Sequence, residues 1–420
     1  MSKHSVNVGG ARPHERGFTV LELMIALLLS AFVVIATYGF FTTASDNTRR
    51  QDDAVRSLER LDFGLAMLRA DLEMAAYLGV PNASLPSDQQ AEDFRLCHDP
   101  ATDGAVSWPI GDPIGAIRVN RQVIAGFADI SPMGANGVAE LELFGAYQIP
   151  EVLRVTGALG NTITLTMPTQ VAMIPDTVGQ RQRAEFQRLI DGGTLAVMNR
   201  FGGAVMADLQ PPNPASPTVG EVVITAMPQL LASEGEACRF GLGVEIFEPG
   251  QRAVVLHRVR YRLEEAGDPD TRTNADWQLV RSVLRPGAAG ADPVEVERTI
   301  LARNIVDFQV FFDLDLSAPA LPPNILRRPA GLGDGEILGG TIPADDATGR
   351  VNRCPHRLRH AYVQLSARFD QALPGLRARP DLALRDTVTV DGEVIPVVTM
   401  RAEIPLRNFY FADQTGAPCI

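Results

Sequence analysis

The chain has 420 residues, of which 45% are hydrophobic and 21% are charged, and its formal net charge is -12. This length is enough for one large domain or two medium domains. An acidic chain lacks the basic surface that non-specific binding to nucleic acid requires, so no nucleic-acid partner is expected.

A long apolar run near the amino terminus dominates the sequence. Between Phe18 and Phe41 the one charged residue is Glu22. As a helix this run would rise roughly 36 Å, at about 1.5 Å per residue, which exceeds a hydrocarbon core of about 30 Å. We therefore predict a membrane-spanning helix over residues 18–41. Because ionisable side chains inside a membrane are rare and functional by default, Glu22 is a candidate functional residue.

A basic segment, residues 1–17, precedes the apolar run. Its charged residues are Lys3, Arg12 and Arg16 against Glu15, a formal charge of +2. The positive-inside rule then predicts a cytoplasmic amino terminus and a head on the outer side of the membrane. Removal of this leader would take the formal charge of the chain from -12 to -14.

The junction between leader and span reads Gly17 followed by Phe18-Thr19-Val20-Leu21-Glu22. An ordinary secretory signal is cut after its apolar region, whereas here the small residue comes before it. The junction resembles the class III signal of type IV prepilins and pseudopilins. This resemblance implies that a prepilin peptidase cuts between Gly17 and Phe18, that Phe18 is N-methylated, and that the helix is kept. It also implies that Glu22 pairs with the amino terminus of a neighbouring subunit and sets the register of a filament.

Residues 42–79 are predicted to continue the helix in amphipathic form. Apolar residues spaced three and four apart form one stripe, made of Leu58, Leu61, Leu65, Leu68, Leu72 and Ala75. The opposite face is charged and carries Asp52, Asp53, Arg56, Glu59, Arg60, Asp62, Arg69 and Asp71. We predict that the stripe packs in the core of the head and that Gly79 and Pro81 end the helix.

Gly39 interrupts the apolar run and has two interpretations. Major pilins often carry a proline at the matching place, so the resemblance implies a helix that loosens inside the filament. A glycine weakens a helix by about 1 kcal/mol, against about 3 kcal/mol for proline, so the loosening would be milder here. Alternatively, the small residue permits close packing of helices in lipid.

Residues 80–420 are predicted to form a β-rich head, because alternating and β-branched apolar residues recur in short segments. The predicted strands are 116–124, 138–144, 161–167, 193–198, 221–227, 241–247, 252–263, 277–284, 305–312, 361–369, 387–390, 394–400 and 401–405. A short helix is predicted over Gln180–Ile190, with turns at 157–161 and at Asp391-Gly392. The predicted fold class is α+β: a long N-terminal helix, half transmembrane and half amphipathic, packed on a large antiparallel β-rich head.

Two segments break the strand pattern. Residues 210–217 hold four prolines and are predicted to separate two halves of the head, 80–209 and 218–420. Residues 316–353 are rich in proline and glycine and show little periodicity. A loop of that length is usually functional or disordered, so we predict an exposed insertion there.

Further segments resemble minor pilins of the PilW type. Residues 65–79 are similar to the helix end of that family, with departures at Ala70, Glu73 and Ala76. The segments 305–313, 362–368 and 404–408 resemble its later strands, and between 80 and 300 the likeness is one of layout.

Four cysteines, Cys97, Cys238, Cys354 and Cys419, fall on the predicted outer side of the membrane, where disulfides form. Four cysteines allow three pairings. We favour Cys97 with Cys238 and Cys354 with Cys419, each pair adjacent in sequence order, and the sequence leaves the other pairings open.

The sequence predicts neither an enzyme nor a metal site. Cys354-Pro355-His356 with His360 has a metal-like spacing but lacks a second ligand pair. Asp313-Leu314-Asp315 supplies fewer oxygen ligands than calcium needs. The chain contains no Gly-x-Ser-x-Gly, no phosphate loop and no HExxH motif. We therefore expect no cofactor.

The resemblance implies a minor pilin, placed at or near the tip of a type IV pilus to prime its assembly. The implied partners are other minor pilins, the major pilin, prepilin peptidase, the inner-membrane assembly platform and a tip adhesin. The protein would cross the inner membrane once, with a periplasmic head, and then join a pilus on the cell surface. Two alternatives remain: a J-type pseudopilin of type II secretion, usually a much shorter chain, and a membrane-anchored periplasmic binding or enzymatic domain.

Overall fold

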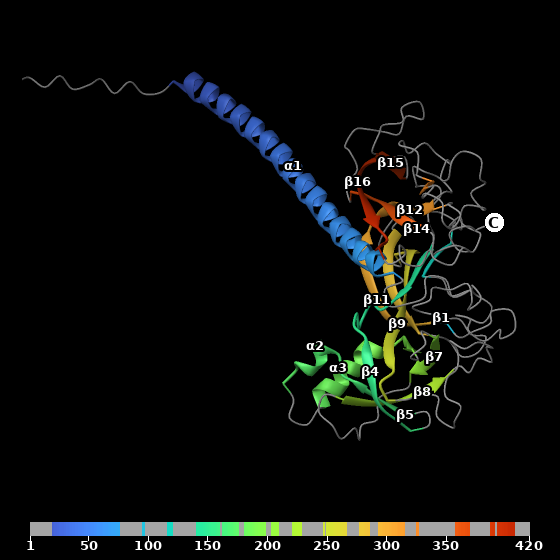
Figure 1. Ribbon diagram of the computed structural model, residues 1–420. Helices are drawn as coiled ribbons and strands as arrows, with labels where there is room; N and C mark the ends of the chain where they lie inside the picture. The colour runs from blue at the N-terminus through green and yellow to red at the C-terminus, as the bar shows by residue number, and fades with distance from the viewer. Residues whose placement is uncertain are drawn as a thin grey trace, which may run out of the picture. The chain divides into compact units, whose positions relative to one another are not determined.

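The computed structural model describes most of the predicted helix and the strands of the head. The described residues are 19–75, 95–96, 116–120, 140–159, 162–175, 180–198, 203–209, 221–228, 247, 249–266, 277–285, 293–315, 325–326, 358–369, 387–390 and 393–407. The chain divides into two compact units, Met1–Val55 and Arg56–Ile420. Helix α1 (Val20–Met74) begins in the first unit and ends in the second (Figure 1). The α+β fold class predicted from the sequence is confirmed.

Within the second unit, α1 buries one side. Leu61, Leu65, Leu68, Leu72 and Ala75 are each 7% exposed or less, so these residues confirm the predicted apolar stripe. The prediction that Leu58 belongs to the buried stripe is wrong, because this residue is 42% exposed. It lies at the edge of the stripe, and Ser57, which is buried, takes the inward position on that turn.

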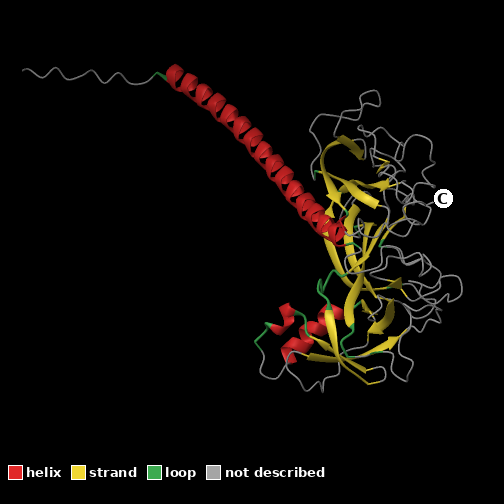
Figure 2. Ribbon diagram, viewed as in Figure 1, coloured by secondary structure: helices red, strands yellow, loops and turns green. Residues whose placement is uncertain are grey.

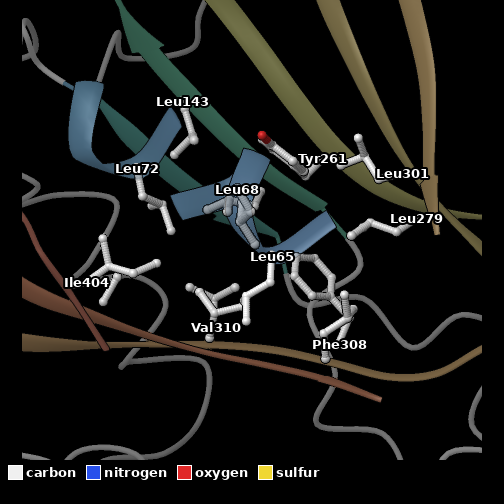
Figure 3. Close-up of a cluster of buried hydrophobic side chains, with 14 of the residues drawn as sticks. Leu65, Leu68, Leu72, Leu143, Tyr261, Leu279, Leu301, Phe308, Val310 and Ile404 are labelled. Atoms are coloured by element: carbon white, nitrogen blue, oxygen red, sulfur yellow. The ribbon is translucent and has the colours of Figure 1, made fainter. Parts of the chain in front are cut away.

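The buried side of α1 lies in a core that we call the helix core. Two sheets contribute to it, and Figure 3 shows Leu65 and Leu68 of α1 among side chains from both. Its members include Leu61, Leu65, Leu68, Leu72, Leu141, Leu143, Val259, Tyr261, Leu263, Leu279, Leu301, Phe308, Val310, Leu365 and Ile404. Full burial of a leucine stabilises the fold by roughly 1.5–3 kcal/mol, so this core can hold the helix in place.

The first sheet has eleven strands. They are β1 (Arg95–Leu96), β2 (Ile117–Asn120), β3 (Glu140–Gly145), β4 (Leu153–Leu159), β5 (Thr162–Thr166), β6 (Gly193–Met198), β7 (Gly203–Leu209), β8 (Glu221–Pro228), β9 (Arg252–Glu265), β10 (Trp277–Arg285) and β11 (Val294–Arg303). Strand β9 is central: β3 and β10 pair with its carboxyl-terminal half, and β4 and β6 pair with its amino-terminal half.

Six strands of the first sheet close into a barrel. Strand β4 pairs with β5, β5 with β8, β8 with β7, β7 with β6, β6 with β9, and β9 with β4, all antiparallel. In β4 and β5 buried residues alternate with more exposed ones, as expected for barrel strands. With the helices α2 (Thr169–Ala172) and α3 (Gln180–Ile190) they form a second core, which we call the barrel core. Its members include Leu153, Val155, Ile163, Leu165, Val171, Phe186, Leu189, Leu195, Val197, Ala253 and Val255.

The second sheet is antiparallel and has the strand order β13-β12-β14-β16-β15. Its strands are β12 (Ile305–Asp315), β13 (Ile325–Leu326), β14 (Leu358–Arg368), β15 (Thr387–Val390) and β16 (Glu393–Pro405). The chain passes from β11 to β12 through Asn304, whose φ of 59° is a left-handed conformation that asparagine tolerates. Figure 2 shows how strands dominate the second unit.

Several predicted elements are confirmed at their predicted bounds, namely α3, β6 and β15. The predicted turn at 157–161 is wrong over its first three residues, because β4 continues to Leu159. The two strands predicted at 394–400 and 401–405 are one continuous strand, β16. Strands β7 and β8 pair with each other, so strands on both sides of 210–217 belong to the first sheet. The predicted loop 316–353 lies outside the described residues except for β13.

Candidate functional site

The candidate site lies at the start of α1. Gly17 and Phe18, where the cut is predicted, lie outside the described residues, which begin at Thr19. Helix α1 starts at Val20, so Glu22 lies in its first turn. A carboxylate in the first turn of a helix is stabilised by the partial positive charge of the free backbone N–H groups.

Thr19 and Glu22 form a capping box. Glu22 Oε2 accepts hydrogen bonds from the backbone N–H of Thr19 at 3.0 Å and from its hydroxyl at 3.1 Å. The backbone N–H of Glu22 donates to Thr19 Oγ1 at 3.2 Å. This reciprocal arrangement satisfies donors that the first turn would otherwise leave free. Sequence reasoning missed Thr19, although the Thr-x-x-Glu spacing is a recognised helix-start signal.

The apolar part of α1 is exposed on every side within the first unit. It is long and apolar enough to cross a membrane. Two of its hydroxyl groups bond to the helix backbone: Ser30 donates to the Leu27 carbonyl at 2.9 Å, and Thr37 donates to the Val33 carbonyl at 2.8 Å. Groups without such partners would be costly in lipid, so these bonds suit a membrane span.

Gly39 lies within the continuous helix. A Cβ added there would meet no heavy atom within 4 Å. Its carbonyl oxygen accepts hydrogen bonds from the hydroxyls of both Thr42 and Thr43, each at 2.9 Å. Hydroxyl bonds to a carbonyl in the preceding turn slightly weaken a helix, so they add to the weakening that glycine itself causes.

A buried ion pair ties the other end of α1 to the first sheet. Asp71 is 6% exposed and Arg281, on β10, is 8% exposed. Asp71 Oδ2 accepts hydrogen bonds from Arg281 Nε at 2.7 Å and from the Tyr261 hydroxyl at 2.6 Å. Burial alone would lower the pKa of Arg281, but the charge and hydrogen bond of Asp71 raise it. The prediction that Asp71 belongs to the exposed charged face is therefore wrong.

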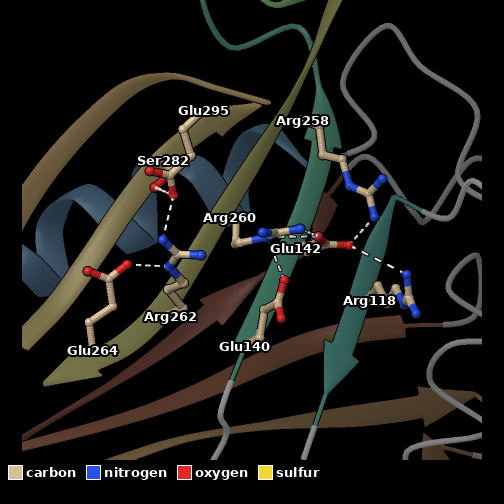
Figure 4. Close-up of polar contacts among 9 residues, drawn as sticks. All are labelled: Arg118, Glu140, Glu142, Arg258, Arg260, Arg262, Glu264, Ser282 and Glu295. Atoms are coloured by element: carbon tan, nitrogen blue, oxygen red, sulfur yellow. Dashed lines mark hydrogen bonds and ion pairs between the residues drawn. The ribbon is translucent and has the colours of Figure 1, made fainter. Parts of the chain in front are cut away.

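The opposite face of the first sheet carries a charge network (Figure 4). Glu142 on β3 pairs with Arg258 and, at 2.9 Å, with Arg260, both on β9. Burial favours a raised pKa for Glu142, but the two arginines outweigh burial and lower it. Burial, followed by the charge of Glu142, raises the pKa of Glu140, which also contacts Arg260. These pairs join neighbouring strands and so favour one strand register.

The network continues across β9, β10 and β11. Arg262 pairs with Glu264 and, at 2.8 Å, with Glu295. Ser282 donates to Glu295 Oε1 at 2.8 Å. Each of these charged side chains has an opposite charge or a hydrogen-bond donor beside it. This arrangement indicates that the network stabilises the sheet rather than binds a ligand. Sequence reasoning missed the network because cross-strand partners become visible only once the register is known.

The remaining predicted sites fall mostly outside the described residues. This holds for Cys97, Cys238, Cys354 and Cys419, and for His356. His360 and Asp313 are described, and the structure brings them together: His360 Nδ1 lies 3.4 Å from Asp313 Oδ2. Over the part of the chain that the structure describes, no group of three or more His, Cys, Asp or Glu side chains has a metal-binding arrangement.

Comparison with known proteins points to the same end of the chain. The family described as the prokaryotic N-terminal methylation motif matches residues 12–38, which include Gly17, Phe18 and Glu22. No curated protein and no solved structure matches the chain. The match supports a type IV pilin-like protein that is anchored in the inner membrane, processed by prepilin peptidase and assembled with other pilins. It suggests a structural role rather than an enzymatic one.

Proposed function

We propose that this chain is a minor pilin of the PilW type that joins a type IV pilus at or near its tip and primes pilus assembly. The observation that carries the proposal is Glu22 in a capping box with Thr19, at the start of an exposed apolar helix within the methylation motif. An acid at that place needs a cationic partner, because an ionised carboxylate is costly in an apolar environment.

The proposed mechanism begins with a cut between Gly17 and Phe18. The cut places an N-methylated, positively charged amino group on Phe18, directly before Thr19. Thr19 engages Oε2 of Glu22, while Oε1 accepts no hydrogen bond from the described part of the chain. That oxygen is available for the amino group of a neighbouring subunit. In lipid neither charge is stable alone, so the pair would fix the axial position of one helix against the next.

One feature supports a place at or near the tip. The head spans residues 80–420, which is bulky for a unit repeated along a thin fibre. The basic leader separately supports a cytoplasmic amino terminus before assembly. The resemblance to minor pilins adds the proposed partners: other minor pilins, the major pilin, the inner-membrane assembly platform and a tip adhesin.

A Glu22→Ala variant tests the proposed assembly step. We expect its incorporation into sheared pili to fall about tenfold or more, with an unchanged level in the membrane, because the neighbour's amino group loses its partner. The matched control is Glu59→Ala, which removes an exposed glutamate of the same helix. Wild-type incorporation of the Glu22 variant, measured by immunoblot of purified pili, would overturn the mechanism.

A J-type pseudopilin of type II secretion is the second candidate, since the methylation motif also fits that class. Deletion of the gene in a strain that has both systems separates the two. Loss of pili with normal secretion supports the minor pilin, and loss of secretion with normal pili supports the pseudopilin.

We also propose two disulfides, Cys97 with Cys238 and Cys354 with Cys419, because the head would fold in an oxidising compartment. Peptide mass mapping without reduction tests the pairing. Peptides linked in either of the two other combinations, or four alkylated free thiols, would refute it.

A further inference from the structure

We propose that residues 146–256 form an inserted barrel unit that is dispensable for maturation and assembly, and that the assembly function resides in α1 and the strands around the helix core. The part of this inference that concerns assembly rests on the proposed function. The part that concerns the barrel as a separate unit rests on strand pairing and core packing alone.

The chain enters and leaves the barrel at adjacent positions. Strand β3 ends at Gly145, and Gly145 is the register partner of His257 on β9 in an antiparallel pair. Beyond this point β3 and β9 continue side by side through Glu140 and Arg262. Without the intervening residues, β3 and β9 would form an ordinary hairpin. The barrel therefore occupies the place of a hairpin loop.

The two cores do not share members. In sequence order the helix core passes from Leu143 directly to Val259. The barrel core lies between these positions, from Ile149 to Val255. No barrel-core residue belongs to α1, so among the described residues the helix is packed by the helix core. Removal of the barrel should therefore leave the packing of α1 largely unchanged.

Strand β9 carries the junction. Val255 belongs to the barrel core, Val259 belongs to the helix core, and His257 lies between them. His257 is fully buried and its Nε2 donates to the Leu189 carbonyl of α3 at 2.9 Å. On β6 its register partner is Gly193. The space at Gly193 is tight, because a Cβ there would lie 2.6 Å from Val255 Cγ1.

Strands outside 146–256 contact the barrel at a few places: β1 pairs with β7 through Arg95 and Leu96, and a small group of residues contacts β10 and β11. Gly192 has a φ of +78°, and a Cβ added there would lie 2.7 Å from Val296 Cγ2. Asp191 and Arg285 form an exposed pair at 3.8 Å, which contributes little because water screens it. Tyr147 packs against the helix core from just inside the insert. These contacts are few compared with the two cores.

The test replaces residues 146–256 of the full-length chain by Asn-Gly. This dipeptide favours the two-residue turn that would connect Gly145 to His257 in their present register. We expect membrane level, cleavage and incorporation into pili to stay within about twofold of wild type, as for removal of an independent local unit. The deletion also removes the contact of Tyr147 with the helix core. Tyr147→Ala in the full-length chain is the control for the loss of that contact. Leu68→Asp, which places a charge in that core, is expected to abolish incorporation.

A second measurement tests the barrel as a unit without reference to assembly. Phe186→Ala removes a fully buried aromatic ring of the barrel core. Hydrogen exchange of the detergent-solubilised full chain should then quicken in β4, β5 and β6 and stay unchanged in β12, β14 and the buried turns of α1. Exchange that quickens in both regions, or a deletion variant that fails to fold, would overturn the proposal. If the wild-type protein is neither cleaved nor incorporated, the proposed function is refuted. The hydrogen-exchange result would still show whether the barrel is a separate structural unit.

Discussion

The carboxylate of Asp307 lies 1% exposed on β12 and is held by amides. Gln364 donates to it at 2.6 Å and Gln309 donates at 3.1 Å. Gln364 in turn accepts from Arg401 Nε at 2.8 Å, so the nearest cation acts through an amide. Burial raises the pKa of Asp307 from 3.8 to about 6, although both amides and Arg401 act to lower it.

Because its folded pKa is higher than its unfolded pKa, Asp307 contributes stability below about pH 4 and loses it as the pH rises through about 6. Asp307→Asn should therefore raise the free energy of unfolding at pH 7.5 by up to about 3 kcal/mol, and by less at pH 5. Gln309, whose Oε1 lacks a hydrogen-bond partner, can rotate to accept from the new amide. Urea unfolding at both pH values measures this, and an unchanged or lower stability at pH 7.5 would contradict it.

His257 has the opposite pH dependence. Burial lowers its pKa from 6.5 to about 4. The contribution of neutral His257 to folding stability is present above about pH 6.5 and is lost as the pH falls to about 4. Between about pH 4 and 6 the effects of His257 and Asp307 on folding stability oppose each other. The pH dependence due to one residue is therefore best measured in a protein in which the other residue has been substituted. His257→Gln should reduce the loss of stability between pH 6.5 and 4.5. The same slope in His257→Gln and wild type would show that this residue does not cause it.

Two glycines form a matched pair for a stability test. A Cβ at Gly64 of α1 would meet its nearest heavy atom, Leu301 Cβ, at 3.6 Å, which is an ordinary contact. Gly64→Ala should therefore stabilise the protein by about 1 kcal/mol through helix propensity. At Gly193 the nearest atom would be 2.6 Å away, so Gly193→Ala should destabilise by about 1–3 kcal/mol. Equal effects of the two variants in thermal unfolding would contradict the described packing.

At the scale of elements, the Asp71–Arg281 pair fixes how α1 lies on the first sheet. Removal of either partner would leave a buried charge alone, so Asp71→Ala and Arg281→Ala should each cost about 3–5 kcal/mol. The double variant Asp71→Ala with Arg281→Ala should cost clearly less than the two single effects added together. A double-mutant cycle in urea measures the coupling. Additive effects would mean that the pair does not act as a unit.

Elements with strong local patterns could be predicted from the sequence. Helix α3 and strands β6 and β15 appear at their predicted bounds, and the leucine stripe of α1 was correct except for Leu58. Strand β11 was missed because four of its ten residues are charged, and partners of Glu295 and Arg298 lie on another strand. Strand β4 was not predicted either, because Gly157 suggested a turn, whereas the structure pairs Gly157 with Thr164 of β5 in an extended strand.

The candidate site could be predicted only in part, because local patterns are visible in the sequence and contacts between distant residues are not. Glu22 stood out because a charge in an apolar run is visible locally, while its link to Thr19 required attention to helix-start spacing. Asp71 was misplaced because it lies near charged residues on a helical wheel, and its cation is 210 residues away in sequence. The barrel could not be predicted, since its closure depends on three pairings between strands that are distant in sequence, β5 with β8, β6 with β9 and β4 with β9.

At the scale of the whole molecule, different parts of the chain carry different tasks. The amino-terminal half of α1 supplies the membrane span and Glu22, and the helix core holds the other half of α1 between two sheets. The barrel has its own core and stands in place of a hairpin loop. This division explains how a pilin-like chain can carry a large head, because an insertion at Gly145 adds a unit without altering the core around the helix.

The central claim is that this chain is a prepilin whose helix is kept after a cut at Gly17. The most direct test is the amino-terminal sequence and intact mass of the membrane-extracted protein, with and without prepilin peptidase. We predict a chain that begins at N-methylated Phe18, found when the peptidase is present and absent without it. A chain that retains residues 1–17 in the presence of the peptidase, or one cut beyond Phe41, would contradict the account.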